Sequence, residues 1–220
     1  MSFHDREEAG ERLAEALADY AERRPVVLAL PRGGVVVAAG IAQALRAPLD
    51  LVLVRKIGVP FQPELAMGAL VDGPEPLVVR NEDIIRLAGV TEEVFDAVRD
   101  RELEEIRRRR AAYLGERPHP GLKGRVAIVV DDGIATGATT RAALRAVRRQ
   151  EPRELVLAVP VAPSSSLTEL RDEADTIVCL ERHEPFYAIG AYYLDFDQVS
   201  DEEVKETLAR FPLEAAEEAE

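Results

Sequence analysis

The stretch RVAIVVDDGIATGATTRAALRAV, residues 125–147, decides the fold. Its apolar run ends at Val130 and predicts a strand over 125–130 that is buried on both faces, as in a parallel sheet. Two acids, Asp131 and Asp132, follow at the expected carboxyl end of this strand, and the small-residue loop GIATG then leads into a helix expected over 138–150. Ligands of such α/β sheets bind beyond the carboxyl ends of the strands. The stretch therefore predicts both a fold and the position of its site.

The flanking sequence continues the same alternation of strands and helices. An amphipathic helix is expected first, because apolar residues recur one helical turn apart over 5–23. The pattern then predicts these elements: strand 25–30 (PVVLAL), a helix from the PRGG turn through about Leu45, strand 50–56 (DLVLVRK), strand 154–160, helix 165–173 and strand 175–180. Buried strands that alternate with helices favour an α/β fold with a doubly wound, mainly parallel sheet.

The middle of the chain interrupts this alternation. Between Ile57 and Gly124, prolines and glycines divide the sequence into short extended pieces, and a helix is expected over 91–114. We expect one domain over 1–220, whose parts are a core over about 1–56 and 125–182, an inserted flap or hood lobe over about 57–124, and a C-terminal hood and tail over about 183–220. The acidic end LEAAEEAE, residues 213–220, is expected to fray.

Composition excludes several classes of protein. A formal net charge of -13 opposes a general affinity for nucleic acid, whose phosphates are bound through basic surfaces. No apolar stretch approaches the roughly 20 residues that span a bilayer, and the acidic N-terminal sequence does not match a signal peptide. Cys179 is the single cysteine, so no intramolecular disulfide can form. We expect a protein of the cytoplasm that binds neither nucleic acid nor membrane.

The residues after Val130 have the chemistry of a sugar-phosphate site. Two ionised carboxylates can accept hydrogen bonds from a vicinal diol, such as that of ribose, or face a magnesium ion through water. The small residues that follow allow backbone N–H groups to surround a phosphate at the start of a helix, beside the hydroxyls of Thr136, Thr139 and Thr140. The alternative is a plain strand-to-helix turn with a helix cap. Neither a Walker phosphate loop nor a Rossmann fingerprint matches the glycine spacing.

VVDDGIATGATT, residues 129–140, resembles the phosphoribosyl pyrophosphate (PRPP) motif of type I phosphoribosyltransferases. The resemblance implies that Asp131 and Asp132 are the catalytic pair that binds the ribose hydroxyls, and that they meet Mg²⁺ indirectly, through bound PRPP and water. It assigns the 5-phosphate to a loop made of Ala135, Thr136, Gly137, Ala138, Thr139 and Thr140. The similar core covers roughly residues 25–56 and 125–180, and the whole chain resembles a subgroup of the family whose acceptor is not known.

Two further stretches gain a role from this resemblance. LPRGG, residues 30–34, is similar to the family's pyrophosphate loop, in which Arg32 and the N–H groups of Gly33 and Gly34 would bind the leaving group. Some members have a non-proline cis peptide in this loop. Arg55 and Lys56, expected at the end of the second strand, would add positive charge. A tight glycine turn and a solvated strand end are the respective alternatives.

A third stretch, ERHEPFYAIGAYY at 181–193, concentrates aromatic residues after the last core strand. Phe186 or Tyr187 could stack on a planar acceptor, as an aromatic at this place does in many members of the family. Packing of the C-terminal lobe is the alternative.

Other charged residues fit structural roles. The three histidines are widely separated and are expected on the surface or in loops. RELEEIRRRR, residues 101–110, spaces Glu104 four residues before Arg108 and Glu105 four before Arg109, which predicts an ion-paired helix face.

The resemblance implies a magnesium-dependent transferase of nucleotide metabolism that moves the 5-phosphoribosyl group from PRPP to a nitrogenous base or similar small nucleophile. Homodimers are common in the family. The alternatives are a regulator that keeps the pocket as a PRPP sensor and an unrelated phosphosugar-binding α/β enzyme. Ala135 stands where six-oxopurine members carry an acid, so hypoxanthine or guanine fits less well as the acceptor. Adenine-specific members have a similar alanine, and Glu64 is a weak candidate for a residue that contacts the base.

Overall fold

The computed structural model describes residues 2–73, 75–115 and 117–212. The acidic end 213–220, for which we expected fraying, lies outside these residues. Within them, a five-stranded sheet has the order β2-β1-β6-β7-β8, and all of its neighbouring strands are parallel. Its strands are β1 (Val26–Ala29), β2 (Leu49–Leu51), β6 (Val126–Val130), β7 (Glu154–Pro163) and β8 (Thr176–His183).

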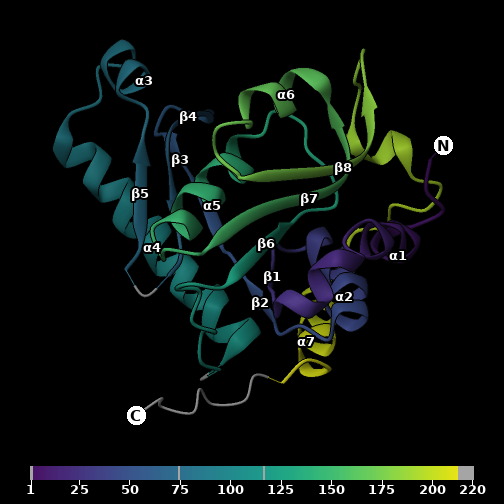
Figure 1. Cartoon of the computed structure of the whole chain (residues 1–220). Coiled ribbons are helices and arrows are strands. Elements are labelled where there is room, and N and C mark those ends of the chain that lie inside the picture. Colours follow the sequence, from purple (N-terminus) through teal and green to yellow (C-terminus); the bar gives the residue numbers. More distant parts are fainter. Residues whose placement is uncertain (1, 74, 116, 213–220) are drawn as a thin grey trace.

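Helices cover both faces of this sheet (Figure 1). On one face lie α1 (Arg6–Ala16), α2 (Gly33–Leu45) and α7 (Asp201–Ala209), and on the other lie α5 (Ala138–Arg148) and α6 (Ser164–Glu169). Alternate residues of β6 show the arrangement, because Ile128 packs on the α2 side and Val129 on the α5 side. The expected doubly wound α/β sheet is therefore confirmed.

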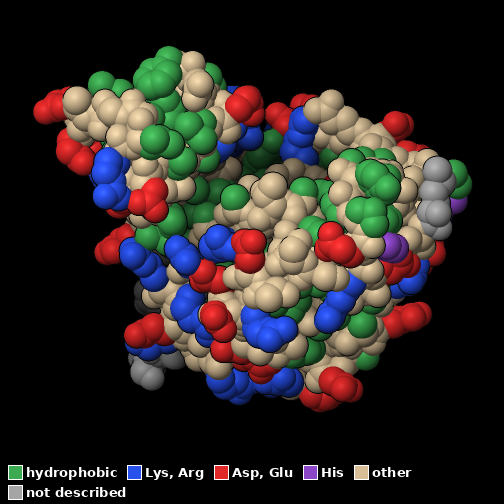
Figure 2. Space-filling model, turned by 90° about the horizontal axis from the view of Figure 1, so that it is seen from above, with side chains coloured by type: hydrophobic (Ala, Val, Ile, Leu, Met, Phe, Trp, Pro, Cys, Tyr) green, Lys and Arg blue, Asp and Glu red, His purple; other side chains and the backbone are tan. Residues whose placement is uncertain are grey.

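A second sheet lies beside the first and is antiparallel, with the order β3-β4-β5. It consists of β3 (Val54–Val59), β4 (Gln62–Val71) and β5 (Leu77–Arg80), and is followed by α3 (Glu82–Leu87) and α4 (Glu92–Leu114). Ile57, Met67, Phe95 and Ile106 form its own buried core. We call residues 54–114 the three-stranded lobe. Figure 2 shows the surface hollowed between this lobe, on the left, and the rest of the molecule.

The strand expected over 50–56 is wrong as one element. Residues 49–51 pair with β1 in the parallel sheet, whereas residues 54–59 pair with β4 in the second sheet. The backbone changes partner between them: the Val52 N–H donates to the Ala29 carbonyl at 2.9 Å, and the Leu53 carbonyl accepts from the Asp72 N–H at 2.8 Å. A continuous apolar run does not reveal such a change of sheet. Arg55 and Lys56 consequently belong to the three-stranded lobe.

Other differences are smaller. The helix expected over 5–23 ends at Ala16, and a 3₁₀ helix, η1 (Ala18–Arg23), follows it. The second 3₁₀ helix, η2 (Ile189–Tyr192), and the helix α7 were not predicted. On α4 the ion-paired face is present, but Glu105 binds both Arg108 and Arg109, each at 2.8 Å. Among the described ranges, no helix combines the length and apolar character needed to cross a bilayer.

Candidate active site

Asp131 and Asp132 leave the parallel sheet at the carboxyl end of β6, whose five residues are all buried. The turn is tight, because the Asp132 N–H donates a hydrogen bond of 2.9 Å to Oδ1 of Asp131. Both side chains are half-buried. The structure therefore places two carboxylates side by side at the edge where ligands of parallel sheets bind.

Asp132 is held by two residues from distant parts of the chain. Nε of Arg6, in the first turn of α1, donates to Oδ2 of Asp132 at 2.8 Å. The same guanidinium lies over the ring of Phe196, 3.8 Å from its centroid, and donates to the Asp197 carbonyl. The Tyr193 hydroxyl donates to the Asp132 carbonyl at 2.7 Å. This carboxylate is therefore oriented before any ligand arrives.

Asp131 has a different electrostatic environment. Burial, and then the negative charge of Asp132, hold the pKa of Asp131 well above its usual range. Arg6 opposes this shift only weakly. The charged form of Asp131 is thus disfavoured in the free protein, and a cation or a hydroxyl donor at this edge would favour its ionisation.

The PRGG turn packs directly on the acid pair. A Cβ atom on Gly33 would lie 1.9 Å from Oδ2 of Asp132 and 2.8 Å from Nε of Arg6. A Cβ on Gly34 would lie 2.9 Å from the Val130 carbonyl oxygen. Only glycine fits at either position, so the turn lies next to the acids because both residues lack a side chain. The Pro31–Arg32 peptide is cis, in the loop for which the family resemblance suggested such a bond.

The loop after the acids opens α5. The Ile134 N–H donates to the Val161 carbonyl at 2.9 Å, and the Ser166 hydroxyl donates to the Ala135 carbonyl at 2.6 Å. Gly137 has a φ of 74°, in the left-handed region that favours glycine, and precedes the first residue of the helix. Among the described residues, no side chain caps this helix N-terminus. Its N–H groups are therefore available to an anion.

Solvent exposure distinguishes the residues of this loop that can contact a ligand from those that are buried. Ala135, Thr136, Ala138 and Thr139 are exposed, whereas Gly137 is buried. Thr140 is only 2% exposed, so its hydroxyl faces the interior rather than solvent. The expectation that three threonine hydroxyls surround the phosphate is thus supported by position for Thr136 and Thr139 only.

Arg32 lies in the PRGG turn, but its side chain points toward α7. Its Nη1 is 3.5 Å from Oδ1 of Asp201, and the Tyr113 hydroxyl donates to the same oxygen at 2.6 Å. Burial, and then the hydrogen bond to Asp201, raise the pKa of Tyr113 to about 12. Arg32 is one-third exposed. A ligand at the turn would have to draw its guanidinium away from Asp201.

Arg55 and Lys56 are neighbours on β3 and therefore face opposite sides of the second sheet. Nε and Nη2 of Arg55 donate to Oε2 of Glu102, on α4, at 2.9 and 2.6 Å. Glu102 is buried, with 7% exposure. Nζ of Lys56 lies 3.2 Å from Oε2 of Glu64, whose side chain is exposed. Both cations are thus compensated by acids of the three-stranded lobe, and the structure does not bring them together on one surface.

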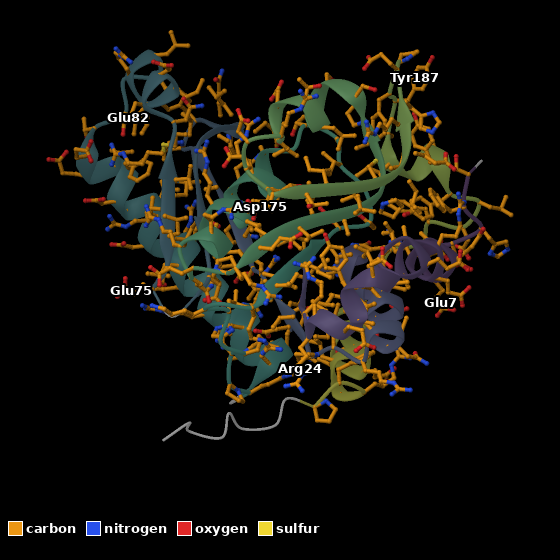
Figure 3. The ribbon with its side chains drawn as sticks, viewed as in Figure 1. Glu7, Arg24, Glu75, Glu82, Asp175 and Tyr187 are labelled. Atoms are coloured by element: carbon orange, nitrogen blue, oxygen red, sulfur yellow. The ribbon has the colours of Figure 1, made fainter. Side chains whose placement is uncertain are left out.

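The two aromatic candidates differ. Phe186 stacks on Tyr192 with ring centroids 5.0 Å apart, and Tyr192 stacks in turn on His183 at 4.3 Å. Packing thus accounts for Phe186. Tyr187 is 82% exposed and projects from the loop after β8, at the upper right of Figure 3. It is the aromatic of this segment that remains accessible to a planar molecule.

Sequence reasoning missed Arg6, Tyr193 and Glu102. Arg6 is separated from Asp132 by 126 positions, and nothing in its helix distinguishes it from the other charged residues there. Tyr193 lies in the aromatic stretch that we singled out, although its role is to bind the backbone of Asp132. Glu102 lies on the helix face that was interpreted as a set of local ion pairs.

Comparison with known proteins places this arrangement in a family. The sequence profile of the phosphoribosyl transferase domain matches residues 2–197. A Mycobacterium tuberculosis protein provisionally named a phosphoribosyl transferase is 44% identical over 215 residues, which are 98% of this chain and 48% of that protein. The chain thus spans about half the length of the curated relatives it matches.

Two solved structures are similar. A Thermus thermophilus protein is 43% identical, with a TM-score of 0.83 over 96% of this chain and 100% of that one. An Aquifex aeolicus protein, 14% identical with a TM-score of 0.51 over 95% of this chain and 85% of its own, shares the fold.

Proposed function

This chain belongs to the phosphoribosyl transferase domain family, and we propose that it transfers the 5-phosphoribosyl group of PRPP to a nitrogenous base or a similar small nucleophile, with release of pyrophosphate. The observation that carries the proposal is the acid pair Asp131–Asp132 at the end of β6, directly before an uncapped helix N-terminus. Diol acceptors beside a phosphate site suit a ribose 5-phosphate.

Each part of PRPP has a counterpart in this arrangement. The carboxylates of Asp131 and Asp132 accept hydrogen bonds from the ribose hydroxyls, and the backbone from Ala135 to Thr140 binds the 5-phosphate. The N–H groups of Gly33 and Gly34, with Arg32, bind the pyrophosphate. Support for this assignment comes from the contact between the turn and the acids, where a Cβ on Gly33 would lie 1.9 Å from Oδ2 of Asp132.

The residues at this edge also fit Mg²⁺. Carboxylate oxygens and water are the ligands that this ion prefers, and the half-buried Asp131, whose pKa is raised, lacks an ion pair of its own among the described residues. Asp131 and Asp132 would hold the ion through water, on the oxygens of bound PRPP. When bound, Mg²⁺ supplies positive charge that neutralises the departing pyrophosphate.

In the reaction, the bond between the ribose carbon and the pyrophosphate oxygen breaks as a bond from the acceptor nitrogen forms. The sugar passes through a state with positive charge on its ring, and pyrophosphate leaves with the bonding electron pair. Asp131 and Asp132 position the ribose and place negative charge near that ring. Arg6 keeps the Asp132 carboxylate in place through its 2.8 Å bond. Arg6 is a positioning residue.

The acceptor site is expected beside the loop after β8. Tyr187 is exposed there and offers a ring on which a planar base can stack. Ala135 leaves the loop without the acid that serves six-oxopurine bases in similar enzymes, so hypoxanthine or guanine fits less well as the acceptor. Glu64, exposed and 3.2 Å from Lys56, stays a weak candidate for contacting the base.

We place this activity in the cytoplasm and expect a homodimer. Cell fractionation and light scattering of the purified chain test these two proposals. The curated relatives are about twice as long, so the transferase activity is proposed for the part that this chain spans.

The experiment is a screen for pyrophosphate release from PRPP and Mg²⁺ in the presence of single purine, pyrimidine and pyridine bases. At least one base should accelerate release above the rate without base. The variant Asp131→Asn, Asp132→Asn should lower that rate by at least about 100-fold, the scale of losing transition-state electrostatics. A matched control, Asp19→Asn with Asp172→Asn, removes the same charge from exposed positions and should keep the rate. Binding of PRPP with no release for any base would reject the transferase and support the alternative, a PRPP sensor.

A further inference from the structure

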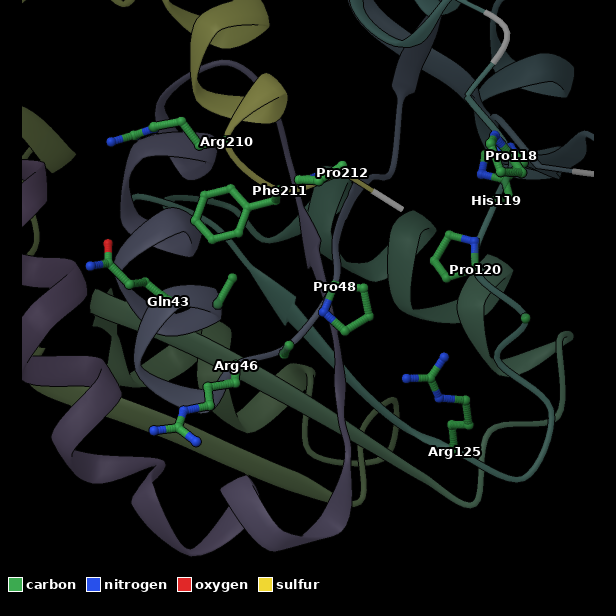
Figure 4. A pocket seen from close by; sticks show the side chains of 13 residues that line it. Gln43, Arg46, Pro48, Pro118, His119, Pro120, Arg125, Arg210, Phe211 and Pro212 are labelled. Atoms are coloured by element: carbon green, nitrogen blue, oxygen red, sulfur yellow. The ribbon is translucent and has the colours of Figure 1, made fainter. Parts of the chain in front are cut away.

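The opposite end of the parallel sheet carries a second hollow, far from the acid pair. Two adjoining cavities, of about 610 and 700 Å³, share Arg46, Pro48 and Arg125 in their walls. These residues precede β2 and β6, whereas Asp131 follows β6. Because β6 has five residues at about 3.3 Å each, the two ends are separated by roughly 17 Å or more. We call the two cavities together the arginine groove; Figure 4 shows the cavity of about 610 Å³.

Four arginines line the arginine groove, namely Arg24, Arg46, Arg125 and Arg210. Within the ranges that the structure describes, none of them forms an ion pair with a carboxylate. Among the described residues, the guanidinium of Arg125 donates only to the Arg24 carbonyl, at 3.4 Å, and that of Arg210 only to the Thr207 hydroxyl, at 3.5 Å. Of the described residues that line the cavity around Gln43 and His119, none is an acid, and Glu22 is the one described acid that lines the other cavity. In a chain of net charge -13, this is a local concentration of positive charge.

The guanidinium of Arg125 is partly shielded from solvent. Its side chain is half-buried, and burial without a carboxylate partner lowers the pKa of its guanidinium. A partly buried cation without a carboxylate partner is less favourable than one in open solvent unless an anion compensates it. An anion in the groove would therefore gain more from Arg125 than from an arginine in open solvent.

The backbone conformation of Arg24 and Arg46, which follow the ends of two helices, supports a role for them in the groove. Arg24 has a φ of 49° after η1, and Arg46 has a φ of 50° after α2. This left-handed conformation costs about 1–2 kcal/mol for a residue with a side chain, and helices usually have glycine there. Both positions carry arginine and both line the same groove. Figure 3 shows Arg24 at the lower end of the molecule, opposite Tyr187.

One wall of the arginine groove is apolar. The half-buried ring of Phe211 lies near Gln43, and Pro48 and Pro120 line the same cavity further from this ring (Figure 4). An aromatic ring forms a flat apolar surface on which a planar group can stack, and the proline rings add apolar surface to the wall. A cavity of several hundred Å³ also has the size of a small-molecule site.

We propose that the arginine groove is a second ligand site, which binds a nucleoside phosphate away from the acid pair. Its phosphates bind Arg46 and Arg125, with Arg24 and Arg210 at the ends, and its base lies against Phe211 and the prolines. Guanidinium groups bind phosphate through paired, charge-assisted hydrogen bonds. The site is independent of the transferase chemistry proposed above.

Calorimetric titration of the full chain with ATP, AMP and adenosine tests the proposal. The groove variant Arg46→Gly, Arg125→Gln should bind ATP at least about tenfold more weakly than wild type, because two charge-assisted contacts are lost. The control Arg107→Gln, Arg149→Gln removes the same charge from exposed residues of α4 and the end of α5 and should bind ATP within about twofold of wild type. Adenosine, which lacks phosphate, should bind at least about tenfold more weakly than ATP.

Two further measurements locate the site and exclude misfolding. ATP should bind the Asp131→Asn, Asp132→Asn variant as it binds wild type, and PRPP should bind the groove variant as it binds wild type. Arg46→Gly should leave the melting temperature unchanged or higher, because glycine favours the left-handed conformation.

Three results would overturn the proposal: no ATP binding by wild type, equal loss in the groove variant and its control, or loss in the acid-pair variant. Light scattering of the wild type would then show whether a second copy of the chain covers the groove instead. Failure of PRPP binding alone would reject the transferase and leave the arginine groove intact.

Discussion

The carboxyl edge of the parallel sheet and the three-stranded lobe both hold charged residues expected to bind PRPP, but they hold them differently. At the edge, Asp132 is bound by Arg6 from another helix and Gly33 packs on it without room for a side chain. In the lobe, Arg55 is paired with Glu102 and Lys56 with Glu64, both acids of the lobe itself. The acid pair of the edge is organised before ligand binds, whereas the cations of the lobe, like Arg32 beside Asp201, must leave existing partners to meet a pyrophosphate.

The largest effect is expected where the edge is most tightly packed. Gly33→Ala places a methyl group 1.9 Å from Oδ2 of Asp132, so the acid or the turn must move. We expect PRPP affinity to fall by at least about 100-fold, and the free energy of unfolding to fall by about 1–3 kcal/mol, as for other overpacked sites. Titration calorimetry and chemical denaturation measure the two changes.

Gly121→Ala is the control, because its Cβ would have no neighbour within 4 Å. Equal PRPP affinity in Gly33→Ala and Gly121→Ala would show that the contact between the turn and the acid is not needed for binding.

The next effect concerns the ion pair that orients Asp132. Arg6→Gln removes the charge-assisted hydrogen bond to a carboxylate whose side chain is only 14% exposed. The free energy of unfolding should fall by about 2 kcal/mol, the scale of a hydrogen bond to a charged group. PRPP affinity should fall by about tenfold, because the ribose acceptor loses its orientation. Arg12→Gln, whose contact with Glu181 is longer at 3.5 Å, should change both quantities less.

In the lobe, the corresponding change is Glu102→Gln. It should lower the free energy of unfolding by about 1–2 kcal/mol, because Arg55 loses two charge-assisted bonds but is itself one-third exposed. Pyrophosphate affinity should rise, since Arg55 is released from its partner. An unchanged or weaker affinity would show that Arg55 does not reach the leaving group.

Neutral replacement of Asp131 should stabilise the folded protein at neutral pH. Burial and Asp132 hold the pKa of Asp131 above its usual range, so the folded protein binds this proton more tightly than the unfolded chain. The free energy of unfolding of wild type therefore falls as pH rises from the ordinary carboxyl pKa through the raised one. Asp131→Asn removes this dependence and should be more stable than wild type at neutral pH, although PRPP binding is lost. Denaturation curves across that pH range test the sign, and a less stable Asp131→Asn would contradict it.

The smallest effect is expected for the exposed pair of the lobe. Glu64 is almost fully exposed, and such ion pairs contribute about 0–1 kcal/mol. Glu64→Gln should change the melting temperature by no more than the error of calorimetry. A clear loss of stability would mean that the lobe is more tightly organised than its exposed charges indicate.

The same contrast explains what could be predicted from the sequence. The parallel sheet was predictable, because β1 and β6 are fully buried runs and the loop after β6 has a specific pattern. The position of Asp131 and Asp132 follows from that strand alone. Arg6 was not predictable, since its contact with Asp132 depends on how α1 packs on the sheet. The change of sheet after Val52 was missed because the apolar run continues through it.

Whether the acid pair binds the ribose of PRPP is decided by calorimetric titration of PRPP with Mg²⁺ into wild type and the Asp131→Asn, Asp132→Asn variant. We predict saturable binding to wild type and a loss of at least about 100-fold in the variant, which keeps the shape of both side chains while removing their charge. Equal affinity in both proteins, or no binding by folded wild type, would contradict this role of the acids.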